Sequence, residues 1–339
     1  MTAEPTTRVI AADADAIGQA ARALAAGGLV AFPTETVYGL GADATNATAI
    51  ARLYAAKGRP AFNPLIAHVA DIAAAHTLGV FDNAAEKLAA AFWPGPLTLV
   101  LRRGLKCPVA ELATAGLNTI AVRIPSHPVA RDILRAFKKP VVAPSANRSG
   151  HVSPTTAAHV LADLRGRVEL IVDGGATWVG VESTIVACLD GRVLLMRPGG
   201  ISRVDIERIF GGSLAEAPEM RVDADADAPI APGMLASHYA PKARLRLDAS
   251  AVRAGEALLA FGAVPPPGAE RATRVLNLSQ SGDLVEAAAN LFSHLRALDT
   301  GVATIAVMPV PHDGLGEAIN DRLARAAAPR ESAVHERDE

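Results

Sequence analysis

Apolar positions in the first two hundred residues repeat with two periods, one typical of helices and one typical of strands. Residues 14–26 carry apolar side chains at i, i+3, i+4 and i+7, with Asp13 or Asp15 available as the cap and a Gly-Gly pair as the stop. Further helices are expected over roughly 47–56, 71–78, 82–92, 128–137, 154–164 and 203–210. Strands are expected over 29–32, 65–69, 97–102, 119–125, 140–145, 168–173, 183–189 and 192–197. Because strands and helices interleave, the pattern predicts an α/β domain over 10–210.

The pattern changes after residue 210. Residues 211–243 are rich in Ala, Pro, Asp and Gly and lack periodicity, which predicts a linker. The part "APGMLASHYAP" is unusual for a passive tether because it carries Met, Leu, His and Tyr together. Strands near 243–248, 257–262, 274–279 and 304–310, with helices near 282–299 and 314–327, then predict a smaller Rossmann-like α/β domain over 244–328 and a charged tail over 329–339.

Composition supports two globular domains. The chain has 339 residues, half of them hydrophobic and only 4% aromatic, so the core must be built from Ala, Val, Leu and Ile. No apolar run approaches the ~20 residues of a membrane span, and the start of the chain lacks the features of a signal peptide. We therefore expect a soluble, cytoplasmic protein with no membrane contact. A slight basic excess in the first domain suits an anionic small ligand or a weak RNA contact.

Familiar catalytic and nucleotide-binding motifs are missing from the sequence. There is no G-x-x-x-x-G-K-[ST], no H-E-x-x-H, no C-x-x-C and no G-x-S-x-G. "GLGAD" contains a G-x-G, but a lone G-x-G is weak evidence. A nucleotide, if one binds, must sit in another kind of cradle.

Polar residues instead gather at the ends of predicted strands and helices. In "AAKGRPAFNPL", Lys57 and Arg59 flank a glycine where a helix should stop, and two close cations repel each other unless an anion lies between them. Solvent-exposed cations favoured by the helix dipole are an equally good interpretation of this motif alone.

Three strands place a basic or titratable side chain at or near an end. In "TIAVRIP" the residues Thr119, Ala121 and Arg123 share one face, while the other face is apolar core. His68 ends "LIAH" and Arg197 ends "VLLMR". A single strand arginine is usually a surface residue, but two of them, each preceding or near a proline, suggest a basic pocket.

The stretch "APSANRSGHVSPTT" follows a buried strand with Ser145, Asn147 and a glycine-bearing loop. Ser153 is expected to cap the next helix, with Pro154 at its first position. A helix start beside such a loop is also an anion site. With no Ser-His pair or paired carboxylates, these clusters predict a site that binds and neutralises anions rather than attacking with its own side chain.

Taken in order, "FPTETVYGLG", "KGRPAFNPL", "WPGPLTLVL", "VRIPSHP", "PSANRSGHVSPT", "ESTIV" and "RPGGI" closely resemble the YrdC-type L-threonylcarbamoyladenylate synthases. The match covers roughly residues 10–210. "APGMLASHYAPKA" and "GLGEAINDRLARAA" further resemble the long, two-domain form of that family. The resemblance implies a twisted mixed sheet with flanking helices and a concave ligand cavity.

The activity implied by the resemblance joins L-threonine, bicarbonate and ATP into threonylcarbamoyl-AMP and releases pyrophosphate. The product serves threonylcarbamoyl-adenosine modification of tRNA next to the anticodon, which other threonylcarbamoyl-transferring proteins complete. Mg²⁺ is expected to be bound by the ATP phosphates, with no protein ligand that we can name. Cations and helix starts would lower the anionic barrier at the α-phosphate.

The resemblance also assigns roles residue by residue. Lys57 and Arg59 are implied as catalytic, and together with Ser145 and Asn147 they carry the family's Lys-x-Arg and Ser-x-Asn signature. The positions implied for ATP are Lys57, Arg59, Asn63, Thr119, Ser145, Asn147, Ser153 and Arg197. The positions implied for threonine are Thr36, His68, Arg123, the backbone of Ala143, and Ser183, with Arg123 pairing with the carboxylate. His238 and Tyr239 of the linker are expected to reach back over the nucleotide, with the second domain as a lid or scaffold.

Two other interpretations stay open on the sequence. One is a related domain that transfers a carbamoyl group to another acceptor, although such relatives sit in larger chains with zinc-finger motifs that are missing here. The other is an RNA-binding translation or ribosome-maturation factor with a vestigial pocket.

Overall fold

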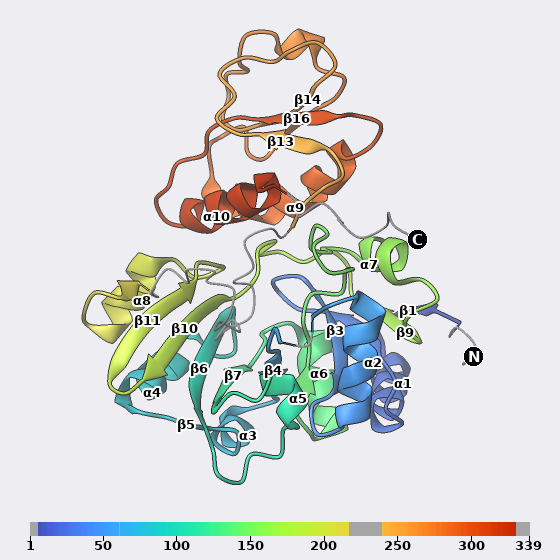
Figure 1. The fold of residues 1–339 in the computed structure, drawn as a ribbon, viewed down its shortest axis with the longest axis vertical. Coiled ribbons are helices and arrows are strands. Elements are labelled where there is room, and N and C mark those ends of the chain that lie inside the picture. The colour runs from blue at the N-terminus through green and yellow to red at the C-terminus, as the bar shows by residue number, and fades with distance from the viewer. Residues whose placement is uncertain (1–5, 61, 217–238, 330–339) are drawn as a thin grey trace, which may run out of the picture.

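The structure, a computed structural model, describes residues 6–60, 62–216 and 239–329, which form two α/β units (Figure 1). The helices of the first unit are α1 (Ala14–Ala25), α2 (Ala47–Lys57), α3 (Ile72–His76), α4 (Asn83–Phe92), α5 (Glu111–Thr114), α6 (Pro128–Phe137), α7 (Ala157–Leu164) and α8 (Arg203–Phe210). Its strands are β1 (Arg8–Ala11), β2 (Val30–Pro33), β3 (Tyr38–Asp43), β4 (Ile66–His68), β5 (Gly79–Val80), β6 (Leu97–Arg103), β7 (Thr119–Arg123), β8 (Val141–Val142), β9 (Leu170–Asp173), β10 (Thr184–Leu189), β11 (Arg192–Arg197) and β12 (Ala215–Glu216).

The strands of the first unit form one mixed sheet in the order β1-β9-β2-β3-β8-β4-β7-β6-β10-β11-β12, with β5 added on β6. It contains both parallel and antiparallel pairs; from β1 the first two are parallel and the next three, from β2 to β4, are antiparallel. In the parallel pair β4–β7, His68 lies opposite Arg123. In the antiparallel pair β10–β11, the register shifts between Ile185 and Val186. The sheet thus sets His68 and Arg123 side by side at the ends of adjacent strands.

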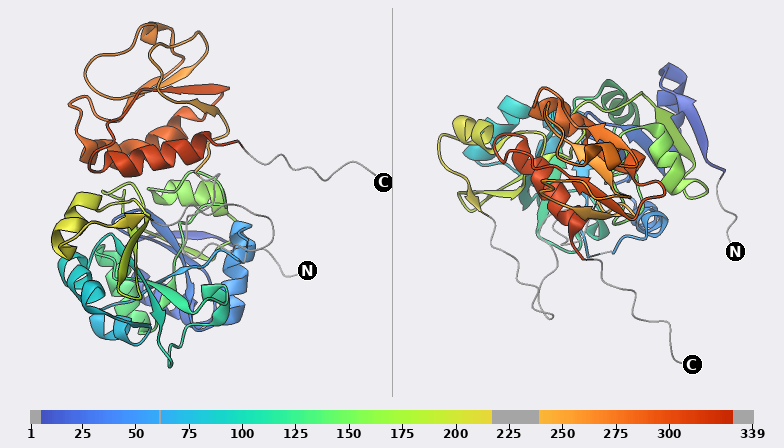
Figure 2. Two further views of the ribbon diagram at one scale, coloured as in Figure 1. Left: turned by 60° about the vertical axis from the view of Figure 1, so that its left-hand side comes forward. Right: turned by 90° about the horizontal axis from the view of Figure 1, so that it is seen from above.

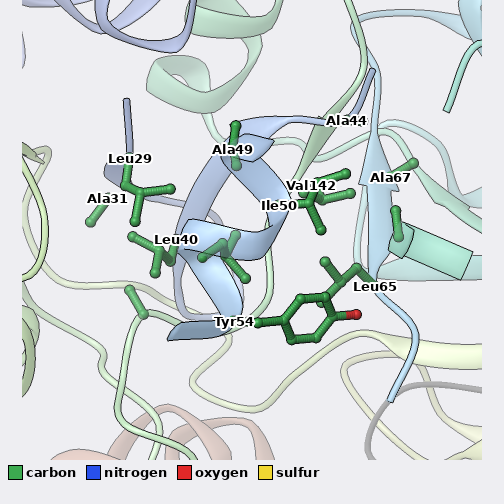
Figure 3. Packing of buried hydrophobic residues seen from close by; sticks show 14 of the residues in the cluster. Leu29, Ala31, Leu40, Ala44, Ala49, Ile50, Tyr54, Leu65, Ala67 and Val142 are labelled. Atoms are coloured by element: carbon green, nitrogen blue, oxygen red, sulfur yellow. The ribbon is translucent and has the colours of Figure 1, made fainter. Parts of the chain in front are cut away.

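Helices cover both faces of the sheet at β2, as the alternation along this strand shows. Ala31 belongs to an apolar cluster with α2, α5 and α7, part of which is drawn in Figure 3. Val30 and Phe32 belong to a second cluster with α1 and α6 on the opposite face. Since successive side chains of a strand point to opposite faces, β2 is buried on both. Such a sheet is rigid enough to hold polar groups at its strand ends.

The second unit is a four-stranded parallel sheet with two long helices. Its strands are β13 (Arg244–Arg246), β14 (Ala257–Ala260), β15 (Val275–Asn277) and β16 (Thr304–Val307), in the order β13-β16-β14-β15. Its helices are η1 (Ala269–Arg271, a short 3₁₀ turn), α9 (Leu284–Leu298) and α10 (Gly316–Ala327). Figures 1 and 2 show α9 and α10 between this sheet and the first unit. These two helices therefore face the first unit.

The fold class predicted from the sequence is confirmed: a large mixed sheet with flanking helices and a second α/β domain. One local prediction is wrong. Helix α7 begins at Ala157 and is capped by Thr156, whose hydroxyl accepts from the amide of His159 at 3.3 Å. Ser153 is therefore not the cap, and Pro154 precedes the helix. No helix within the described ranges is long and apolar enough to cross a membrane.

Candidate functional site

Polar side chains from several strand ends line one cavity in the first unit. The lining comprises Thr36, Val37, Arg59, Pro64, Leu65, Ile66, His68, Arg123, Ala143, Pro144, Ser145, Glu182, Ser183, Arg197 and Tyr239. Nine of the positions that the family resemblance implied are among these residues. The cavity has a volume of about 50 Å³.

Arg123 at the end of β7 is held by a buried carboxylate. Its Nη2 donates to Glu35 Oε1 at 2.6 Å and to the Thr36 hydroxyl at 3.0 Å. The other oxygen of Glu35 accepts from the backbone amide of Ser126 at 3.0 Å. Burial alone would raise the pKa of Glu35, but the charge of Arg123 outweighs it and lowers that pKa. The guanidinium is therefore fixed in direction, with Glu35 behind it.

His68 at the end of β4 is neutral at ordinary pH. Burial, together with the nearby charge of Arg123, lowers its pKa to about 3. Its Nδ1 lies 3.1 Å from the carbonyl oxygen of Ile66, which can only accept, so Nδ1 carries the proton. In a neutral ring that carries its proton on Nδ1, Nε2 is a hydrogen-bond acceptor.

Arg197 at the end of β11 packs against the segment that enters β10. Its Nη2 donates to the carbonyl oxygen of Ser183 at 2.9 Å and to the Ser183 hydroxyl at 3.2 Å. That hydroxyl also lies 2.7 Å from Thr98 Oγ1 on β6. Burial lowers the pKa of Arg197 without removing its charge at neutral pH. A second guanidinium thus faces the cavity on a separate strand.

Arg59 adds a third cation from the loop after α2. Its Nη2 donates to the carbonyl oxygen of Pro64 at 3.1 Å. Burial lowers its pKa to about 10, and Arg197 contributes to that shift in the same direction. Nearby, the side chain of Asn63 is buried, and both its amide nitrogen and its oxygen lack a partner among the described residues. Buried amides normally hydrogen-bond, so this asparagine, although it is not part of the cavity lining, is a candidate for contact with a ligand.

Lys57 does not line the cavity. Its Nζ donates to the carbonyl oxygens of Ser145 and Asn147, and the side chain is buried. Burial lowers its pKa well below the ordinary value, and Arg59 adds to the effect. Lys57 therefore acts on the loop that carries Ser145, which does line the cavity.

Other predicted positions also lie behind the wall. Asn147 donates to the carbonyl oxygen of His151 at 2.7 Å, while its own side-chain oxygen is buried without a partner in the described chain. Ser153 donates to Glu182 Oε1 at 2.5 Å. Ala143 contributes to the lining directly, whereas His238 falls outside the described residues.

Thr119 is not brought to the cavity. It shares a face of β7 with Arg123 but begins the strand, opposite Arg102 of β6. Four residues along a strand correspond to roughly 13 Å. A shared face therefore does not imply a shared site.

Three candidate functional residues have no role in the predictions made from the sequence. Glu35 stands in the polar run that follows β2, so its position was a usable signal. Glu182 is the first residue of "ESTIV"; it lines the cavity and pairs with Arg322 of α10 at 2.9 Å. Nothing in the sequence of α10 distinguishes Arg322 from a surface arginine of an amphipathic helix.

Comparison with known proteins gives the same extent of similarity as the motifs. A family model described as telomere recombination matches residues 22–199, and a model described as threonylcarbamoyl-AMP synthase, C-terminal domain, matches residues 201–328. The threonylcarbamoyl-AMP synthase of Bacillus subtilis is 42% identical over 330 residues, which is 93% of each chain. That of Pyrococcus abyssi is 41% identical, over 90% of this chain and 92% of the relative.

One solved structure matches nearly the whole chain, and another matches little more than half of it. The crystal structure of P. abyssi Sua5 complexed with L-threonine matches with a TM-score of 0.84 at 38% identity, covering 95% of this chain and 97% of that one. The first unit alone shares its fold with E. coli YciO, with a TM-score of 0.51. The chain therefore belongs to the threonylcarbamoyl-AMP synthase family, in its two-domain form.

Proposed function

We propose that this protein synthesises L-threonylcarbamoyl-AMP from L-threonine, bicarbonate and ATP, with release of pyrophosphate. The observation that carries the proposal is the convergence of Arg59, Arg123 and Arg197 on one cavity beside a neutral histidine. Two negatively charged reactants, a carbamate and a polyphosphate, can meet only where cations offset their repulsion.

Threonine is assigned to the side of the cavity formed by Thr36, His68 and Arg123, with Ala143 and Ser183. The Arg123 guanidinium, held by Glu35, suits the α-carboxylate. Neutral His68 offers an acceptor at Nε2, which suits the donor groups of an amino acid with a hydroxyl. This side selects and orients the amino acid and excludes water from it.

ATP is assigned to the side formed by Arg59, Ser145 and Arg197. Asn63 would satisfy its unpartnered amide on the nucleotide. Lys57, Asn147 and Ser153 support this side by holding the loop and Glu182. Tyr239, and His238 of the same linker, are assigned to the nucleotide as well. Thr119 retains its assignment only through the family resemblance.

The reaction has two bond-forming steps. The threonine amine and bicarbonate give a carbamate and water. A carbamate oxygen then bonds to the α-phosphorus while the bond from that phosphorus to the pyrophosphate oxygen breaks. Arg59 and Arg197 would stabilise the charge that develops on the phosphates, and Arg123 would hold the carboxylate away from them.

Magnesium is proposed to arrive on the ATP phosphates. The charged groups on the nucleotide side are cations, which favours a metal carried by the substrate phosphates over one held by the protein. When bound, it would supply additional positive charge at the leaving pyrophosphate.

The domain and cellular assignments follow the same proposal. Catalysis is assigned to residues 10–210, ligand contact to the linker 211–243, and a supporting role to 244–328, with a tail at 329–339. The product would pass to tRNA-modifying threonylcarbamoyl-transferring proteins in the cytoplasm, with at most a weak RNA contact of its own.

The decisive experiment measures pyrophosphate release with each substrate omitted in turn. The proposal expects release only when ATP, threonine and bicarbonate are all present. Turnover that is indifferent to threonine would favour carbamoyl transfer to another acceptor. RNA binding without any turnover would favour a translation or ribosome-maturation factor.

A further inference from the structure

An arginine of the second domain reaches the wall of the cavity. Arg322 of α10 is fully buried, and its Nε donates to Glu182 Oε2 at 2.9 Å. Its Nη1 donates to the carbonyl oxygen of Pro198 at 2.8 Å and to Asp321 at 2.7 Å. Glu182 lines the cavity, whereas Arg322 lies behind it. The second domain therefore supplies the counter-charge of a cavity residue.

The same helix pair holds Tyr239. The ring of Tyr239 stacks on Phe292 of α9, with centroids 5.5 Å apart, and the Arg322 guanidinium lies 5.4 Å from the ring centroid. Tyr239 has a φ of 63°, a left-handed conformation that non-glycine residues adopt at some cost. Its ring is kept in the cavity wall by packing from both α9 and α10.

The charge of Glu182 matters because Arg197 is close by. Burial alone would raise the pKa of Glu182, but Arg322 and then Arg197 lower it, so the carboxylate is ionised. An ionised Glu182 without Arg322 would have Arg197 as its nearest counter-charge. A guanidinium that is paired with a carboxylate binds an incoming polyphosphate less strongly. An unpaired carboxylate in the cavity wall repels the polyphosphate.

We propose that Arg322 is a positioning residue of the nucleotide site: it neutralises Glu182 so that Arg197 stays available to an anionic ligand. This inference rests on the proposed function only for the identity of the anion as ATP. It assigns the second domain a direct part in setting the charge of the site, beyond covering it.

The test compares four variants of the full-length protein: Arg322→Met, Arg322→Lys, Glu182→Gln, and Glu182→Gln combined with Arg322→Met. Calorimetric affinity for Mg-ATP and the separate KM values for ATP and threonine are the readouts. Arg322→Met is expected to weaken ATP binding about tenfold or more, with less than about threefold change in the KM for threonine. Arg322→Lys, which keeps the charge, should stay closer to the wild type.

The double variant distinguishes an effect of charge from a loss of packing. A neutral pair often replaces a buried ion pair without loss of stability, so adding Glu182→Gln to Arg322→Met should restore ATP affinity to within about threefold of the wild type. Simple loss of packing would predict no such rescue. Should Arg322→Met fail to fold, the double variant is compared directly with the wild type under the same criterion.

The matched control is Arg203→Met. Arg203 also crosses the domain boundary, pairing with Glu317 of α10 at 2.6 Å, but both side chains are about a quarter to a third exposed and neither lines the cavity. It should leave ATP affinity unchanged. An Arg322→Met protein that is folded and binds ATP like the wild type would overturn the inference, as would a double variant no better than the single one.

Failure of the proposed function would look different. In that case the wild type would release no pyrophosphate with the three substrates, while the calorimetric comparison of ATP affinity among the variants would still decide the role of Arg322.

Discussion

Two buried arginine–glutamate pairs border the cavity, and they are built in opposite senses. In the Arg123–Glu35 pair the arginine faces the cavity, the glutamate lies behind it, and both belong to the first domain. In the Arg322–Glu182 pair the glutamate faces the cavity, and the arginine behind it comes from the second domain. The first pair presents a cation to a ligand, whereas in the second pair the arginine neutralises the charge of a glutamate in the cavity wall.

The difference has an energetic consequence. Breaking either pair leaves an uncompensated buried charge, which costs about 3–5 kcal/mol of stability. Neutralising both partners removes that cost in each case. Only at the Arg123 pair does neutralisation also remove a group that a ligand needs. The two pairs should therefore respond alike in stability and differently in function.

The largest effect is expected from Arg123→Met, which removes the cation of the pair that faces the ligand. Without the guanidinium, kcat/KM for threonine should fall by at least about a hundredfold, because a charged carboxylate contact is lost. The melting temperature should fall as well, because Glu35 is left unpaired. Steady-state kinetics and thermal unfolding measure both.

The companion variant combines Arg123→Met with Glu35→Gln. It should recover stability but not activity, in contrast to the recovery of ATP affinity expected for the neutralised Arg322 pair. Recovery of threonine turnover in this double variant would show that the Arg123 pair, like the Arg322 pair, contributes only charge neutralisation and no direct contact to the ligand.

Lys57→Met should have the next largest effect, on the support of the nucleotide side. It leaves the carbonyl oxygens of Ser145 and Asn147 without their buried donor, at about 1–3 kcal/mol for each unpaired group. Chemical denaturation should show the loss, accompanied by a raised KM for ATP. Lys106→Met at the exposed surface is the control, and equal stability of the two variants would contradict this role for Lys57.

The buried, neutral His68 beside Arg123 makes the stability of the folded protein depend on pH. Its pKa is about 3 in the folded protein and 6.5 as an ordinary value. Between these values the unfolded chain binds a proton that the folded protein does not, so stability falls as the pH drops below about 6.5. The slope has an upper limit of about 1.4 kcal/mol per pH unit for one proton.

Replacing His68 by glutamine should flatten that part of the stability profile, measured as the unfolding free energy from pH 7 to pH 4. His312→Gln at the exposed surface serves as the matched control. An unchanged slope in the His68 variant would mean that other groups dominate the acid response.

The smallest effect is expected from Arg203→Met, which removes a partly exposed pair across the same domain boundary. Such pairs contribute about 0–1 kcal/mol. The melting temperature should barely move, and both KM values should be retained. A large loss would indicate that position at the boundary, and not burial beside the cavity, determines the importance of an interdomain pair.

The long periodic elements were predictable because a single face of each is apolar. The predicted ranges 128–137, 192–197 and 203–210 coincide with α6, β11 and α8. Strand β3 was missed because its sequence, YGLGAD, is buried at every position and shows no alternation. The start of α7 was misplaced because "SPTT" offers more than one capping hydroxyl, and tertiary contact with Glu182 takes that of Ser153.

Within the site, the cations at strand ends could be predicted, because adjacent strand ends meet in space. His68, Arg123 and Arg197 show this. The partners behind the wall could not, since their contacts join segments far apart along the chain: Arg322 and Glu182 are separated by 140 positions. A helix pattern gives the buried face of α10 but not the residue across from it.

The placement of Arg322 has a practical consequence for anyone who wishes to shorten this protein. Removing the second domain would delete α9 and α10 and leave the Glu182 carboxylate ionised in the cavity wall with no arginine behind it. A working minimal enzyme would therefore require redesign as well as truncation, starting with an uncharged substitute for Glu182.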